Sequence, residues 1–176
     1  MLAALTLVLS TSEALAQSDT ESAQARAVLL EQGSFAKMQD MDFGRIVKSG
    51  SAGTVLLAPS AAPTCTTTGG LVHSNECQAA MFAGDASFLF LLRVTRPPGG
   101  QIFLNGPGGA TMRLNNFTFG AASPVLNLGS SATEQRYLIL TANGSFAFYV
   151  GGTLHVAANQ AGGNYNGTFV IQVNYN

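Results

Sequence analysis

The fold is decided by a stretch near the end of the chain, which reads Tyr165-Asn166-Gly167-Thr168-Phe169-Val170-Ile171-Gln172-Val173-Asn174-Tyr175-Asn176. Every second position carries an apolar residue or a glycine, and the positions between them are mostly polar; the first set is Tyr165, Gly167, Phe169, Ile171, Val173 and Tyr175. A period of two predicts a β-strand with one apolar face over residues 167–175. We expect that face to be buried against the body of the domain or against another polypeptide.

The composition also favours a β-protein. The 176 residues suffice for one domain, and 47% of them are hydrophobic while only 10% are charged. A helical protein of this size usually carries many more Lys and Glu on its exposed faces. The net charge of −1 comes from scattered residues that form no basic stripe, so nucleic-acid binding has no electrostatic support.

Short strand patterns recur along the chain and are separated by Gly, Pro, Asn and Ser, which predicts a sandwich or a barrel. We expect strands at residues 27–30, 34–38, 41–47, 53–58, 77–82, 87–94, 101–105, 111–117, 125–128, 136–141, 145–150, 153–157 and 167–175. Residues 88–92 are apolar on both faces, which predicts a central strand. Asn143-Gly144 predicts a type I′ hairpin turn, and Gly151-Gly152 predicts a bulge or a reversal.

The first residues have the pattern of an export signal. Residues 2–9 are apolar, and Ala14-Leu15-Ala16 forms a small-residue cleavage site before Gln17. We therefore expect a signal peptide over residues 1–16, an N-terminal extension over residues 17–30, and a β-sandwich domain over residues 31–176. No positive charge precedes Arg26, so the signal could start upstream of Met1. A buried helix or a membrane anchor is the alternative interpretation of residues 2–9.

Cys65 and Cys77 are the only cysteines. Export to an oxidising compartment predicts a disulfide between them, and a pair of free thiols is the alternative. Two thiolates without a well-spaced pair of histidines do not complete a zinc site.

Residues suited to catalysis are few. His155 alternates with two apolar neighbours and is expected on a solvated strand face, while His73 lies in a polar loop between the cysteines. Asp40 and Asp42 would share one face of a strand, which favours a solvated edge over a cation site. No G-x-S-x-G nucleophile elbow occurs. We therefore expect no catalytic site, no cofactor and no metal, and we do not expect an enzyme.

Several blocks resemble a family of secreted bacterial proteins that is catalogued only as a domain of unknown function. The first is Val150-Gly151-Gly152-Thr153-Leu154, followed by the block over residues 163–175. Two earlier blocks, Met41-Asp42-Phe43-Gly44-Arg45-Ile46-Val47 and Gly53-Thr54-Val55, are similar to the family in the same order. The resemblance spans about residues 27–175.

The tail further resembles chaperone–usher pilins, and Asp42-Phe43-Gly44 is similar to a block of their archaic branch. This resemblance implies an immunoglobulin-like antiparallel β-sandwich that lacks its last strand. It implies that a periplasmic chaperone first covers the gap, and that assembly at an outer-membrane usher brings in the N-terminal extension of the next subunit by strand addition. The tail residues quoted above, from Tyr165 to Tyr175, would then form the assembly strand.

The candidate donor segment is residues 17–30. Two sets of small or aliphatic residues alternate in it, namely Ala23, Ala25, Ala27 and Leu29 on one face and Val28 and Leu30 on the other. The expected function is a structural subunit of a filament at the cell surface, a homopolymer held by donated strands. The alternative is a secreted β-sandwich that does not polymerise and acts as an adhesin or a carbohydrate-binding module with a host or surface glycan as its partner.

Overall fold

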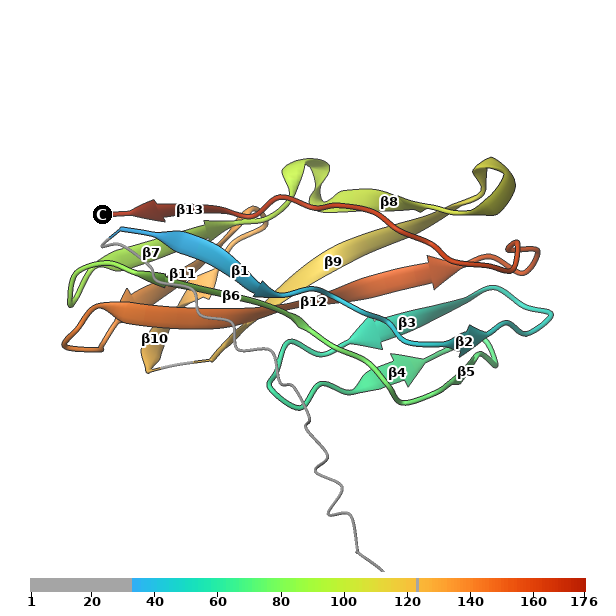
Figure 1. The fold of residues 1–176 in the computed structure, drawn as a ribbon, viewed down its shortest axis with the longest axis horizontal. Helices are drawn as coiled ribbons and strands as arrows, with labels where there is room; N and C mark the ends of the chain where they lie inside the picture. Colours follow the sequence, from blue (N-terminus) through green and yellow to red (C-terminus); the bar gives the residue numbers. More distant parts are fainter. Residues whose placement is uncertain (1–32, 123) are drawn as a thin grey trace, which may run out of the picture.

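The computed structural model describes residues 33–122 and 124–176, which form an antiparallel β-sandwich (Figure 1). The predicted β-sandwich is therefore confirmed. The expected signal peptide over residues 1–16 and the expected donor segment over residues 17–30 lie outside the described residues. In the described part of the chain, no helix has the length and apolarity needed to cross a membrane.

The first sheet is built around one long central strand, β12 (Ser145–Val156). Its strands follow the order β1 (Phe35–Gln39), β6 (Ala80–Asp85), β12, β3 (Gly53–Leu57) and β4 (Cys65–Thr67). On the other side of β12 lies β9 (Thr111–Ala121), which in turn pairs with β8 (Gln101–Asn105). Because β6 pairs with the first half of β12 and β3 with the second half, the sheet divides into two branches at β12.

The second sheet has four strands in the order β10 (Val125–Ser130), β11 (Glu134–Ile139), β7 (Leu91–Thr95) and β13 (Gln172–Tyr175). A separate short pair joins β2 (Ile46–Val47) to β5 (Val72–His73). Two single-turn 3₁₀ segments, η1 (Pro98–Gly100) and η2 (Pro107–Gly109), flank β8.

Aromatic rings fill the core between the two sheets. Phe148 of β12 is fully buried, and four further rings lie within about 6 Å of it by centroid distance: Phe35 at 6.0 Å, Phe82 at 5.7 Å, Phe119 at 6.1 Å and Tyr137 at 6.3 Å. Rings in this range of distances contribute stability beyond the area that they bury. The core is therefore centred on the middle of β12.

Arg96, which follows β7, joins the two sheets by hydrogen bonds to main-chain carbonyls. Its Nε donates to Phe117 O at 3.1 Å, and its Nη1 donates to Ser131 O at 2.6 Å and to Glu134 O at 3.2 Å. Its guanidinium carbon also lies 5.4 Å from the centroid of the Phe119 ring. One side chain thus connects β9 of the first sheet to the β10–β11 turn of the second.

The predicted central strand over residues 88–92 is wrong in its first half. β7 begins only at Leu91, and Phe88, Leu89 and Phe90 lie in a turn with exposed side chains. Leu89 adopts a positive φ of 63°, which lies outside the extended region of regular strand backbone. An apolar run without alternation does not distinguish a buried strand from an exposed turn.

Two further expectations about the chain path need correction. The patterns at residues 145–150 and 153–157 form the single strand β12, in which Gly151-Gly152 produces a register shift against β9 that agrees with the predicted bulge and not with a reversal. At Asn143-Gly144 only the glycine has a positive φ, and Gly144 N donates to Thr141 O at 2.9 Å. This turn is not a type I′ hairpin, because it leads from β11 in one sheet to β12 in the other.

Candidate functional site

One flank of the sandwich is left open between the edge strands β1 and β13. Among the described residues, β1 pairs only with β6 and β13 pairs only with β7, although the two edge strands run beside each other (Figure 1). A side-chain bond links them, in which the Tyr175 hydroxyl donates to Ser34 O at 3.3 Å. The outward backbone groups of both edges are therefore available for pairing with a further strand.

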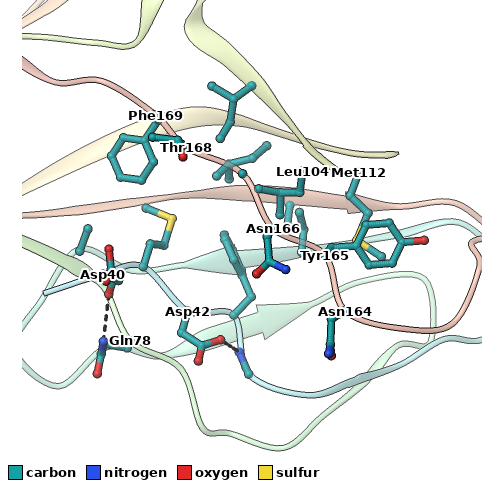
Figure 2. Close-up of a pocket in the computed structure, with 18 of the residues that line it drawn as sticks. Asp40, Asp42, Gln78, Leu104, Met112, Asn164, Tyr165, Asn166, Thr168 and Phe169 are labelled. Carbon is teal, nitrogen blue, oxygen red and sulfur yellow. Dashed lines mark hydrogen bonds between the residues drawn. The ribbon is translucent and has the colours of Figure 1, made fainter. Parts of the chain in front are cut away.

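Next to these edges lies a groove with a cavity volume of about 850 Å³, which we call the flank groove. Residues 40–44 form one wall and residues 163–171 form the other, as Figure 2 shows from the positions of Asp42 and Tyr165. The floor consists of apolar side chains from the four strands β6, β8, β9 and β12, namely Phe82, Ile102, Leu104, Met112, Leu114 and Leu154.

The first wall is fixed by main-chain bonds. Asp42 and Gln78 exchange two backbone hydrogen bonds of 2.8 Å each, and Gln78 Nε2 donates to Asp40 O at 3.0 Å (Figure 2). Asp42 Oδ1 accepts a bond from Gly44 N at 2.8 Å. Gly44 has a φ of +63°, and a Cβ atom there would lie 1.9 Å from Glu76 O, so only glycine fits.

The carboxylates and the histidine near this wall have structural partners. Asp40 pairs with Lys37 Nζ at 2.5 Å, and both side chains are exposed, as expected for a solvated edge. His73 Nε2 lies 2.6 Å from Phe43 O, and its Nδ1 accepts a bond from Asn75 N at 2.8 Å. The strand predicted over residues 41–47 forms only at Ile46–Val47, because Asp42 makes an isolated bridge before the chain turns at Gly44.

The second wall begins on the first sheet. Asn105 and Asn166 exchange two backbone hydrogen bonds of 2.7 and 2.9 Å, so the segment starts beside β8. The Tyr165 hydroxyl accepts a bond from Gln160 Nε2 at 2.7 Å and donates to Ala161 O at 2.8 Å, which holds the ring at the end of the groove.

The remainder of this wall has no backbone partner. Residues 167–171 make no backbone hydrogen bond within the described part of the chain, and pairing resumes only when β13 reaches β7. The strand predicted over residues 167–175 is therefore confirmed only for Gln172–Tyr175. The reason is topological: the segment crosses from the edge of the first sheet to the edge of the second, and no strand lies beside it on the way.

The alternation of this wall is nevertheless confirmed in its burial. Ile171 is 8% exposed and Phe169 is partly buried, with its ring centroid 5.4 Å from that of Phe117, whereas Val170 is 59% exposed. Val173 and Tyr175 continue the same inward face on β13. The apolar face of residues 165–175 thus turns inward, as the sequence predicts, while its central backbone lies open.

The cysteine pair lies close to the first wall. Cys65 on β4 and Cys77 are half-buried free thiols, and Cys77 directly precedes Gln78, the backbone partner of Asp42 in the first wall. Burial raises the pKa of the Cys65 thiol, and the hydrogen bond with Cys77 raises this pKa further, so the two sulfur atoms are neighbours. The proximity agrees with the predicted pairing, and the disulfide itself stays a prediction.

The sequence pattern predicted the inward apolar face of the second wall of the flank groove, but it did not identify the residues of the floor. Leu104, Met112 and Leu154 lie on three different strands and meet only through long-range pairing. Their alternation with exposed neighbours was the available signal for burial, but it did not assign them to a groove. The donor-segment residues from Ala23 to Leu30 lie outside the described residues.

Comparison with known proteins identifies the family of this chain. No curated protein and no solved structure gives a significant match to this chain. One family model matches residues 34–175, a range that includes both sheets and both walls of the flank groove. The chain therefore belongs to the family described as Domain of unknown function (DUF4402).

Proposed function

We propose that this protein is a structural subunit of an extracellular filament, and that an extended segment from a neighbouring copy occupies the flank groove. The observation that supports this proposal most directly is the combination of an apolar floor with the unpaired backbone of residues 167–171. A small-molecule site usually offers a few convergent polar side chains. The flank groove instead offers main-chain groups along one wall and apolar contacts below, as strand addition requires.

The alternation of side chains along an extended strand suits a groove with an apolar floor. A strand places successive side chains on opposite faces, so every second residue would point to the floor. In residues 17–30, the face with Ala23, Ala25, Ala27 and Leu29 is the better candidate for the floor, because small side chains fit over the rings of Phe82 and Phe169, whose centroids lie 6.3 Å apart. A buried leucine in such a groove contributes about 1.5–3 kcal/mol.

Assembly by strand donation also defines the partners and the location. The proposal includes export by the signal over residues 1–16, a periplasmic chaperone that covers the groove before assembly, an outer-membrane usher, and a final position at the cell surface. It includes no catalytic role. Insertion of residues 17–30 into the groove of their own copy is the competing arrangement, and it would give a non-polymerising module.

The test is the deletion of residues 17–30 from the exported protein. We expect a folded subunit that forms no multimers resistant to warm detergent, whereas the intact protein forms such multimers and appears as fibres in electron micrographs. Truncated protein that still polymerises would show that the donor assignment is wrong. Intact protein that gives only single particles, together with residues 17–30 protected inside the same copy, would support self-insertion instead.

A matched pair of substitutions tests the orientation of the donor. Leu29→Asp would place a charge on the floor and prevent multimers, whereas Leu30→Asp on the opposite face would leave them intact. Equal effects of the two substitutions would contradict the insertion of an alternating strand.

A further inference from the structure

A row of five side chains crosses the outer face of the first sheet, on strands that lie side by side. The register pairs Phe103 of β8 with Arg113 of β9, Arg113 with His155 of β12, and His155 with Thr54 of β3. Thr54 Oγ1 lies 2.8 Å from Thr68 Oγ1, which extends the row to the end of β4. The flanking positions, such as Leu114 and Leu154, are buried, so the row points away from the core.

These five side chains surround a shallow depression of about 470 Å³. Thr111 and the buried Gln160 also line it, and the remaining lining residues are small or apolar, namely Ala52, Gly53, Val156 and Ala157. Gln160 Nε2 is held by Thr111 O at 3.1 Å, and its backbone oxygen accepts a bond from Lys48 Nζ at 2.9 Å. The depression thus presents threonine hydroxyls, the Gln160 amide and the Phe103 ring. The ammonium group of Lys48 lies beside Gln160.

Neighbouring side chains orient the guanidinium of Arg113 but do not neutralise its charge. Asn115 Oδ1 can only accept, so His155 Nε2 donates to it at 2.8 Å, which leaves His155 Nδ1 as the acceptor for Arg113 Nη2 at 3.3 Å. Burial and then the charge of Arg113 lower the pKa of His155, which agrees with a neutral ring. The other N–H groups of the guanidinium are available to a ligand.

No carboxylate balances this charge within the described residues. Neither Asp nor Glu lines the depression, and the ion pairs in the described part of the chain join Lys37 to Asp40 and Arg136 to Glu134, away from the row. The protein as a whole carries a net charge of −1, so this positive surface is a local feature. A planar guanidinium fork binds a carboxylate through two parallel hydrogen bonds.

The aromatic neighbour narrows the class of ligand. Phe103 is 52% exposed and stands next to Arg113 in the register, so about half of its surface is open to solvent beside the guanidinium. A pyranose ring presents a flat C–H face that packs on an aromatic ring, and its hydroxyls exchange hydrogen bonds with threonine hydroxyls. A free phosphate or a simple carboxylate would leave the Phe103 ring uncovered.

We propose that this row binds a carboxylated saccharide, with the carboxylate on Arg113, the sugar ring over Phe103, and sugar hydroxyls on Thr54 and Thr68. The site lies on a single copy and does not involve the flank groove. The proposal is therefore independent of the filament proposal, and either one can fail without the other.

The test is titration of the full chain with oligogalacturonate, followed by calorimetry, with the fully methyl-esterified oligomer as the uncharged control. We expect the acid form to bind at least about 10-fold more tightly than the ester, since a charge-assisted bidentate contact is lost. Arg113→Gln should remove that difference, and Phe103→Ala should weaken both forms. Arg113→Lys, which keeps the charge but lacks the fork, should give an intermediate affinity.

Arg45→Gln is the matched control, because Arg45 is exposed but lies outside the row. Thermal melts of the variants check that all of them fold. Equal binding of the acid and ester forms, an equal loss in Arg45→Gln and Arg113→Gln, or no binding at millimolar oligomer would each overturn the proposal. Inorganic phosphate that competes as well as the oligomer would show a general anion site and would also contradict a saccharide ligand.

Discussion

Strand β12 and the segment over residues 163–171 have similar sequence patterns but opposite surroundings. Both alternate inward apolar residues with outward residues, and both contain glycine. β12 has β9 on one side and β6 or β3 on the other, whereas residues 167–171 have no strand on either side among the described residues. The comparison shows that alternation reports which face is buried and says nothing about whether the backbone is paired.

Amide hydrogen exchange should give the largest difference between these two regions. In the isolated protein, the amides of residues 167–171 should exchange at least about 10³-fold faster than those of residues 147–150, because the latter open only with global unfolding. A peptide with the sequence of residues 17–30 should slow exchange at residues 167–171 and leave residues 147–150 unchanged. If the amides of the two regions were equally protected from exchange before the peptide is added, residues 167–171 would not be an unpaired backbone segment.

The second-largest difference is expected in the free energy of unfolding when one aromatic ring is removed from each region. Phe148→Ala should reduce the free energy of unfolding by about 3–5 kcal/mol, because it empties the centre of the core. Phe169→Ala serves as the matched control from the groove wall and should lose clearly less, since that ring is only partly buried. Urea denaturation of both variants measures the difference. A loss in Phe169→Ala as large as that in Phe148→Ala would mean that the wall is part of the rigid core.

The smallest effect is expected at Tyr137, whose buried hydroxyl has no hydrogen-bond partner within the described residues. Tyr137→Phe should change the free energy of unfolding by less than about 1 kcal/mol, because no bond is lost. Burial raises the pKa of Tyr137 to about 12, above its ordinary value of 10.0. The folded state therefore retains the proton that the unfolded state loses, and stability should fall as the pH rises through this window.

Thermal melts between pH 8 and pH 12 check this expectation. The decrease in melting temperature above pH 10 should be shallower in Tyr137→Phe than in the parent protein. It should not vanish, because burial also raises the pKa of Tyr175, with Asp85 adding to the effect. Identical alkaline slopes in the two proteins would show that the Tyr137 hydroxyl reaches water.

The sequence carried enough information for the fold class and for one strand with its bounds, Gln101–Asn105, because period-two patterns are local. It also predicted that Ile171 and Tyr175 face inward. It could not predict that Leu104 and Leu154 meet below the flank groove, or that Phe103 and His155 flank Arg113 outside it. Those neighbours depend on the order of strands in the sheet, which is a long-range property that no local pattern encodes.

The hydrogen bonds of Arg96 between the two sheets affect the range of pH and salt that the sandwich tolerates. Its guanidinium binds three carbonyl oxygens and lies over a ring, with no carboxylate among these contacts, in contrast to the exposed Lys37–Asp40 pair. Amide carbonyls do not titrate, and a guanidinium stays protonated in acid. Salt screens an exposed pair of opposite charges more than the partly buried bonds from Arg96 to Phe117 O and Glu134 O. The contacts that Arg96 makes between the two sheets should therefore persist at acidic pH and at high ionic strength.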